Sequence, residues 1–162
     1  SAQTLVSNPD VLLELIYRAV SVKATVVSED FKESYAREAL NYGHTLGHAI
    51  EKNEKYKWRH GDAVSVGMVF AAELALADGK LSESVVKRHR DILKIVGLPT
   101  QYKHKNFKKL IEIMALDKKS RGATLRFVIL EDVAKPTRLE NPSLDHLVLE
   151  PLSFRHLLPC CV

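Results

Sequence analysis

The chain has 162 residues, of which 46% are hydrophobic and 27% charged, with a formal net charge of +4 and a sequence pI near 9.0. This composition excludes a disordered chain, and because no apolar run approaches the roughly 20 residues of a membrane span, it predicts a soluble protein with no membrane partner. The length suits one compact domain, and the lack of signal-peptide features at the N-terminus leads us to expect a cytoplasmic protein.

Two long helices are predicted in the first third of the chain. Asn8 can cap a helix that begins at Pro9, and apolar residues recur at helical spacing over residues 11–26. After a polar break, a second helix is expected over residues 34–52, followed by a loop at residues 53–61. The second helix carries most of the residues that suggest chemistry.

Three further helices are predicted in the middle of the chain. Residues 63–77 are apolar on nearly every side, which favours a helix buried inside a bundle. Ser82 can cap the next helix, and Gly97 followed by Pro99 provides its stop signal. A shorter helix is expected over residues 107–116.

The C-terminal part is predicted to contain a loop and a hairpin. Residues 117–122 are typical of a loop, and two strands are expected at residues 124–130 and 135–139, joined by residues 131–132. Residues 151–162 match no element, so we expect a disordered tail. The predicted fold is mainly α, a helical bundle with a small β-hairpin near the C-terminus.

Four polar side chains lie along one face of the second predicted helix. Arg37, Asn41, His44 and His48 are spaced by four, three and four residues, so they project from the same side. The opposite side offers apolar residues to the core, namely Leu40, Leu46, Ala49 and Ile50. Packing can therefore hold this helix while it presents a polar stripe.

Two glycines are also expected inside this helix. Gly43 and Gly47 would each cost about 1 kcal/mol relative to alanine in a helix interior. We interpret the pair as a sign that a ligand or another backbone approaches the helix closely.

Histidines on the stripe suggest a metal site. His44 and His48 are four residues apart, a spacing at which neutral imidazole nitrogens can share a divalent metal. The pair alone is a weak signal, because surface histidines meet at this spacing by chance. His60 strengthens it, since the chain can fold this residue back toward the stripe from the start of the buried helix. The alternative is that His60 caps that helix or rests against Trp58.

Three lysines are candidate contacts for an anionic substrate. Lys23 lies among valines on the first helix, and Lys118 and Lys119 lie near Gly122 in the predicted loop, where they could hold a phosphate as point charges. The simpler interpretation is that Lys23 extends into solvent and that the paired lysines form an exposed charged turn.

A specific family signature occurs at residues 37–51, REALNYGHTLGHAIE, followed by HGDAV at residues 60–64. This pattern resembles the 3-dehydroquinate synthase family, and Lys23, residues 117–119 and residues 125–128 fall where that family has its other C-terminal elements. The resemblance covers about residues 5–149. It implies that residues 1–150 form the C-terminal helical domain, which binds metal and substrate, of an enzyme of the shikimate pathway of aromatic amino acid biosynthesis.

The resemblance further implies a catalytic zinc, or cobalt, with His44 and His60 as two of its three protein ligands and an upstream glutamate as the third. It corrects the interpretation that His44 and His48 chelate together, because His48 would face the phosphate region of the substrate. No glutamate-bearing segment of the expected kind occurs in the sequence. We therefore expect an incomplete metal site and weak zinc binding by this chain alone.

The resemblance also implies how a sugar-acid phosphate substrate is held. Arg37 and Lys23 would bind its carboxylate and hydroxyls, Asn41 would add a hydrogen bond, and Lys118 or Lys119 would contribute positive charge. The complete enzyme would be a lyase that converts 3-deoxy-arabino-heptulosonate 7-phosphate to 3-dehydroquinate with release of phosphate. Bound NAD would oxidise one carbinol and later reduce it again.

An N-terminal NAD-binding domain is implied by the resemblance, and we expect it to be absent from this chain. The sequence contains no glycine-rich dinucleotide fingerprint, so NAD binding by this chain alone is not expected. The resemblance also implies a homodimer for the full enzyme. We expect the chain to be inactive by itself.

Two alternatives stay open at this point. One is another sugar-phosphate cyclase or a metal-dependent polyol dehydrogenase, although a neutral polyol would leave Arg37 and the paired lysines without partners. The other is a non-enzymatic helical module that binds a partner or nucleic acid through the basic cluster at residues 103–109. Basic and acidic residues are interleaved along most of the chain, so we expect no nucleic-acid partner.

Overall fold

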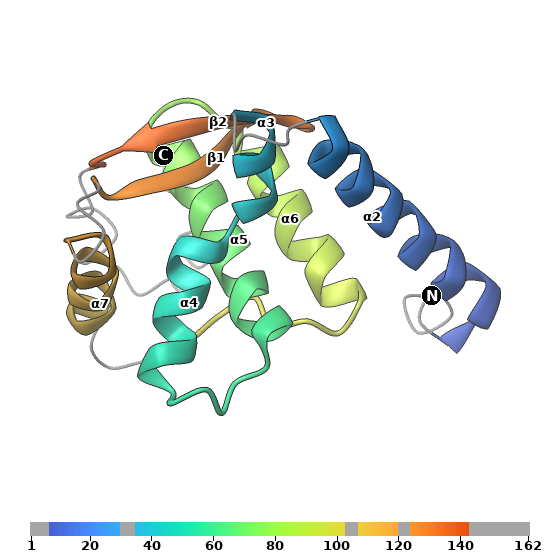
Figure 1. Cartoon of the computed structure of the whole chain (residues 1–162), viewed down its shortest axis with the longest axis horizontal. Coiled ribbons are helices and arrows are strands. Elements are labelled where there is room, and N and C mark those ends of the chain that lie inside the picture. The colour runs from blue at the N-terminus through green and yellow to red at the C-terminus, as the bar shows by residue number, and fades with distance from the viewer. Residues whose placement is uncertain (1–6, 30–34, 103–106, 120–123, 143–162) are drawn as a thin grey trace, which may run out of the picture.

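The computed structural model describes residues 7–29, 35–102, 107–119 and 124–142, and these are mostly helical with one antiparallel hairpin (Figure 1). The elements in chain order are α2 (Pro9–Glu29), α3 (Tyr35–Glu38), the 3-10 helix η1 (Ala39–Asn41), α4 (His44–Asn53), α5 (His60–Ala77), α6 (Glu83–Ile95), α7 (Phe107–Lys119), β1 (Arg126–Asp132) and β2 (Lys135–Glu140). The predicted fold class is confirmed. The predicted tail at residues 151–162 and part of the basic cluster, residues 103–106, lie outside the described residues.

Helix α5 is the centre of the bundle, as its apolar sequence predicted. It lies between α4 and α6, with the hairpin across one end (Figure 1). The helix is long and apolar enough to span a membrane by composition, but most of it is buried in the protein core. Phe70 on α5 packs with its ring centroid 5.7 Å from those of Phe107 and Phe127, which joins α5 to α7 and β1. Burial of apolar surface therefore holds these elements together.

One buried ion pair joins α5 to α6. Nη2 of Arg90 lies 2.6 Å from Oε1 of Glu73, and both side chains are almost fully buried. Because a buried charge is costly without its partner, the pair constrains how the two helices dock.

Three glycines bring α4 against α5. A Cβ atom on Gly67 would lie 1.9 Å from the carbonyl oxygen of Gly43, and one on Gly47 would lie 3.2 Å from the Cα of Val64. Only residues without a side chain permit this approach. The expectation of a close backbone contact is confirmed, and that backbone belongs to α5.

The second predicted helix is not continuous, which corrects the sequence-based expectation. Residues 35–53 form α3, η1, a turn at residues 42–43 and then α4. Gly43 precedes α4 with a φ of 80°, a left-handed conformation that ends helical geometry and that glycine adopts at little cost. Arg37 and Asn41 therefore do not share one helical face with His44 and His48.

The first predicted helix is confirmed and lies at the edge of the protein. Oδ1 of Asn8 accepts a hydrogen bond of 3.0 Å from the backbone N–H of Asp10, as expected of a capping residue. Helix α2 contacts α3 and otherwise stands apart from the bundle (Figure 1). Its large exposed apolar side chains are Leu12, Leu13, Leu15, Ile16, Tyr17, Val20 and Val22.

Helix α6 has the predicted limits, whereas α7 is longer than predicted. Ser82 precedes α6, and Gly97 follows it with a φ of 78°. Helix α7 continues to Lys119, so residues 117–119 are helical and do not belong to a loop. The charged run there misled the sequence-based prediction, although lysine is a good helix former.

The two predicted strands are confirmed, but their turn is displaced. Glu131 and Asp132 belong to β1, and the chain reverses at Val133 and Ala134, where Ala134 has a φ of 61°. The carboxylate of Asp132 accepts a hydrogen bond of 2.7 Å from the backbone N–H of Val133. Because neither turn residue is a typical turn former, the sequence favoured the acidic pair instead.

Candidate functional site

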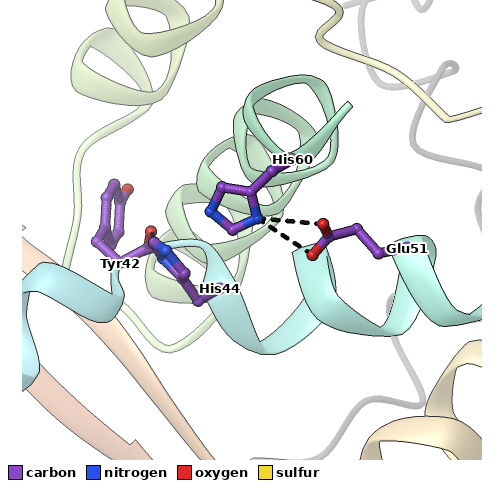
Figure 2. A network of polar contacts seen from close by, with 4 residues as sticks. All are labelled: Tyr42, His44, Glu51 and His60. Carbon is purple, nitrogen blue, oxygen red and sulfur yellow. Dashed lines mark hydrogen bonds and ion pairs between the residues drawn. The ribbon is translucent and has the colours of Figure 1, made fainter. Parts of the chain in front are cut away.

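Three histidine rings meet at the junction of α4 and α5. The ring centroid of His44 lies 5.4 Å from that of His48 and 5.3 Å from that of His60, and the His48 and His60 centroids are 5.9 Å apart. His60 is the first residue of α5 and points back toward α4 (Figure 2). Arg59 occupies the capping position, and Trp58 packs against Tyr102.

Two of these rings are held through the same nitrogen. Nδ1 of His60 lies 3.2 Å from each carboxylate oxygen of Glu51, and Nδ1 of His44 lies 3.2 Å from the backbone carbonyl oxygen of Tyr42 (Figure 2). A carbonyl oxygen only accepts hydrogen bonds, so Nδ1 of His44 is the donor in that contact. This leaves Nε2 of a neutral His44 ring with a free lone pair.

Glu51 was not predicted to belong to the site. It follows His44 and His48 on α4 at the spacing four and then three, so it continues the face that the two histidines occupy. That extended spacing was the signal that could have identified it. One ligand atom from each of His48, Glu51 and His60 lies within 4.8 Å of the others, so this trio can also hold a metal ion.

Burial keeps His44 neutral. Desolvation lowers the pKa of His44 below its ordinary value and outweighs the opposing effect of the Tyr42 carbonyl, while neighbouring His48 and His60 lower it further. A histidine must be neutral to bind a metal ion. The site thus offers at least one imidazole in the required state near neutral pH.

A pocket with a volume of about 400 Å³ adjoins the histidines. This volume lies within the range of small-molecule sites. Of the residues predicted to contact substrate or metal, Asn41, His44 and His48 line it. Its other lining residues come from α3, α4, the loop after α4, α7 and β1: Glu38, Thr45, Ala49, Glu51, Lys52, Tyr56, Ile113, Met114, Arg126 and Val128.

None of the other predicted site residues is among the described residues that line this pocket. Arg37 is half-buried on α3, and Lys23 is exposed on α2; neither is among the described lining residues. Lys118 and Lys119 belong to the last turn of α7, and their side chains lie outside the described residues.

The hairpin attaches to α3 and to the first turn of α4. Glu38 forms ion pairs with Arg126 and Arg138 of the two strands, the former with 3.6 Å between Oε1 and Nη1. The hydroxyl of Thr45 donates a hydrogen bond of 3.0 Å to the backbone carbonyl of Arg126. Sequence reasoning missed Arg126, because its approach to the pocket depends on how the hairpin docks.

Tyr42 is anchored below the site. Its hydroxyl lies 3.1 Å from Nε2 of His89 and 3.3 Å from the backbone carbonyl oxygen of Met68. Nδ1 of His89 lies 2.8 Å from the carbonyl oxygen of Val85 and so donates to it, which leaves Nε2 as an acceptor in the neutral ring. Burial raises the pKa of Tyr42, so the hydroxyl stays protonated. These contacts hold the side chain of Tyr42, while its backbone carbonyl accepts the hydrogen bond from His44.

The sequence matches a family model described as 3-dehydroquinate synthase C-terminal over residues 1–120. Among curated relatives, a 3-dehydroquinate synthase from Streptomyces coelicolor is 62% identical over 129 residues, which make up 80% of this chain and 36% of that protein. The chain thus spans about a third of the length of the curated relatives that it matches.

Solved structures of related synthases share the fold. A 2-epi-5-epi-valiolone synthase from Streptomyces hygroscopicus, with NAD+ and Zn2+ bound, superposes with a TM-score of 0.77 at 19% identity over 91% of this chain and 42% of its own. A 2-deoxy-scyllo-inosose synthase, complexed with carbaglucose-6-phosphate, NAD+ and Co2+, has a TM-score of 0.70 at 29% identity over 82% of this chain and 40% of its own.

Proposed function

The chain belongs to the 3-dehydroquinate synthase family, and we propose that it is the metal- and substrate-binding part of an enzyme that converts 3-deoxy-arabino-heptulosonate 7-phosphate to 3-dehydroquinate and phosphate. The observation that carries the proposal is the meeting of three imidazoles beside a substrate-sized pocket. A helical module without catalysis has no need to converge such groups.

The residues at the α4–α5 junction fit a zinc ion. His44 and His60 would supply two ligands through Nε2, because their Nδ1 atoms are occupied by the Tyr42 carbonyl and the Glu51 carboxylate. We place the third ligand in the part of the protein that this chain does not span. Zinc bound there would polarise an oxygen atom of the substrate.

Side chains of this chain would bind and orient the anionic substrate. His48 and Asn41 line the pocket and would donate hydrogen bonds to phosphate oxygens. Lys52 and Arg126 line the same pocket and add positive charge, although Glu38 and Glu140 already pair with Arg126. Pocket residues of α4, α7 and β1 would exclude water from the reacting groups.

We also propose substrate contacts for four residues that are not among the described residues lining the pocket. Arg37 and Lys23 would hold the carboxylate and hydroxyls of the substrate, and Lys118 or Lys119 would add charge from the end of α7. The contribution of Arg37 and Lys23 requires the substrate to extend beyond the pocket toward α2 and α3, where the rest of the protein would close the site.

NAD is proposed to bind outside this chain. The seven glycines of the sequence form no dinucleotide fingerprint, so its residues do not provide the usual phosphate-binding loop. Two structural neighbours were solved with NAD+ and a divalent metal. We propose that an N-terminal domain of the same enzyme binds NAD, that the enzyme is a cytoplasmic homodimer, and that this chain alone is inactive.

The alternative is another sugar-phosphate cyclase. The structural similarity to 2-deoxy-scyllo-inosose synthase supports this alternative. Sequence identity favours the first assignment, since the relatives named 3-dehydroquinate synthase are 55–62% identical. That neighbour was solved with carbaglucose-6-phosphate, which has a phosphate but no carboxylate. A carboxylate on the substrate therefore distinguishes the two assignments.

The test is an activity assay in which the remaining part of the Streptomyces coelicolor relative is added to this chain. We expect phosphate release from 3-deoxy-arabino-heptulosonate 7-phosphate only when both parts, zinc and NAD are present. His44→Ala should abolish the activity, whereas Lys87→Ala, on the outer face of α6, should not. Turnover of a sugar phosphate that lacks the carboxylate, in place of the sugar-acid phosphate, would contradict the assignment.

A further inference from the structure

The carboxylate of Glu51 is the acidic group that meets the histidines in the described part of the chain. Glu51 lies on α4 and His60 opens α5, so their contact bridges two helices (Figure 2). The side chain of Glu51 is 14% exposed, whereas that of His60 is 57% exposed. A largely buried carboxylate interacts more strongly with a neighbouring dipole than an exposed one does.

The geometry at His60 fixes which nitrogen carries the proton. Both oxygens of Glu51 lie 3.2 Å from Nδ1 of His60, so an Nδ1–H group points between them and donates to both. In a neutral imidazole protonated at Nδ1, the lone pair is on Nε2. That atom is then free to act as a ligand.

The same arrangement occurs at His44. Its Nδ1 donates to the carbonyl oxygen of Tyr42 at 3.2 Å, which again leaves Nε2 free. The Tyr42 carbonyl and the Glu51 carboxylate therefore each accept a hydrogen bond from the Nδ1–H of one ring. A hydrogen-bond acceptor behind the ligand nitrogen is a common second partner of metal-bound histidines and raises the basicity of the ring.

Resting on the proposed zinc site, we propose that Glu51 is a positioning residue that holds His60 in the Nδ1–H tautomer and directs Nε2 to the metal. Glu51 itself is not a ligand. The competing arrangement takes His48, Glu51 and His60 as the three ligands, since their ligand atoms also lie within reach of one another. The two arrangements differ in what the removal of Glu51 does to His60.

The first test reads the tautomer in the metal-free chain by long-range proton–nitrogen NMR, at a pH where the rings are neutral. In the unaltered chain, His44 and His60 should both carry the proton on Nδ1. Glu51→Ala should return His60 alone to the Nε2–H form that imidazole prefers in water, and His44 should not change. A His60 ring that carries its proton on Nε2 in the unaltered chain, or that keeps Nδ1–H in Glu51→Ala, would overturn the proposal.

The second test measures zinc affinity by competition with a chromophoric chelator, on this chain mixed with the rest of the Streptomyces coelicolor relative. Glu51→Ala should weaken zinc binding roughly 10–100-fold, which is the usual effect of removing such a partner. Glu51→Gln should weaken it less, because the amide oxygen still accepts from Nδ1–H. Glu54→Gln, which changes a carboxylate beside Tyr102 at the end of α4, is the matched control and should leave the affinity unchanged.

Histidine variants distinguish the two roles of Glu51. If Glu51 positions His60, then His44→Ala and His60→Ala should abolish binding, and His48→Ala should have a smaller effect than Glu51→Ala. If His48→Ala and Glu51→Ala each abolish binding while His44→Ala does not, Glu51 is a ligand and the proposal is wrong. Absence of zinc binding in every sample would refute the proposed function, whereas the tautomer measurement would still decide the role of Glu51.

Discussion

The α4–α5 junction and helix α2 differ in what fixes their side chains. At the junction, glycines let the backbones of α4 and α5 touch, and this docking brings the rings of His44 and His60 together. Helix α2 also carries many apolar residues, yet most of its large apolar side chains are exposed, and its closest packing within the described residues is against α3. The junction is therefore defined by contacts within the chain, whereas Lys23 lies exposed on a helix that makes few such contacts.

The largest effect should come from separating the two backbones at the junction. Gly67→Ala would place a Cβ 1.9 Å from the carbonyl oxygen of Gly43, and neither backbone can yield without undocking α4 from α5. We expect a loss of about 4 kcal/mol or more in the free energy of unfolding. Urea denaturation measures it.

The matched control is the same substitution on the same helix. A Cβ on Gly61 would meet nothing within 4 Å, so Gly61→Ala should be neutral or stabilise α5 by up to about 1 kcal/mol. Equal destabilisation by both variants would contradict this account, because a Cβ at Gly61 has no backbone to displace.

Paired truncations of isoleucine compare the two regions directly. Ile50 on α4 is fully buried, and Ile50→Ala should destabilise the chain by roughly 2–5 kcal/mol. Ile16 on α2 is 52% exposed, so Ile16→Ala should cost less than about 0.5 kcal/mol in the isolated chain. A large cost at Ile16 in urea denaturation would mean that α2 is packed in solution.

A smaller effect is expected where Tyr42 is anchored. Tyr42→Phe removes the hydroxyl that meets His89 and the Met68 carbonyl, and should cost about 1 kcal/mol. His44 should keep its contact with the backbone carbonyl of residue 42, so zinc affinity should change little. Thermal unfolding and zinc titration of the same variant measure the two quantities, and a loss of zinc binding as large as that in His44→Ala would contradict this account.

The smallest effect on stability should appear at high pH, where Tyr102 titrates. Tyr102 packs against Trp58, which lies in the loop before His60. Burial, together with the hydrogen bond to Glu54, raises the pKa of Tyr102 to about 12, from 10.0 for an unperturbed tyrosine. Because this group holds its proton more tightly when folded, its contribution to stability is complete below about pH 10 and is lost as the pH rises toward 12. Below about pH 10 the unaltered chain should be more stable than Tyr102→Phe, and this difference should shrink as the pH rises toward 12. A difference that stays constant over this range would assign it to lost packing and not to the proton of Tyr102.

The sequence was sufficient for features that depend on local pattern. The all-round apolar character of α5 identified the central helix, and Ser82 and Gly97 gave the limits of α6. The break before α4 could not be predicted from local sequence. The left-handed conformation of Gly43 accompanies its close contact with α5, and α5 is a separate helix that follows α4 in the chain. The displaced hairpin turn had a similar origin, since sheet register and not turn propensity selected Val133 and Ala134.

The site was predictable to the same degree. His44, His48 and His60 were identified from spacing and from family resemblance, and the structure brings their rings together. Glu51 was missed although it continues the same helical face, and Arg126 was missed because it reaches the pocket from a strand far along the sequence. The roles of Lys23, Arg37, Lys118 and Lys119 stay predictions.

The central claim is that His44 and His60 hold one metal ion between them. Its most direct test is an anomalous difference map at the zinc edge from crystals of this chain combined with the rest of its relative. We predict a single peak roughly 2.0–2.1 Å from Nε2 of both His44 and His60. A peak bound by His48 and Glu51 and remote from His44, or no peak at these rings, would contradict the account.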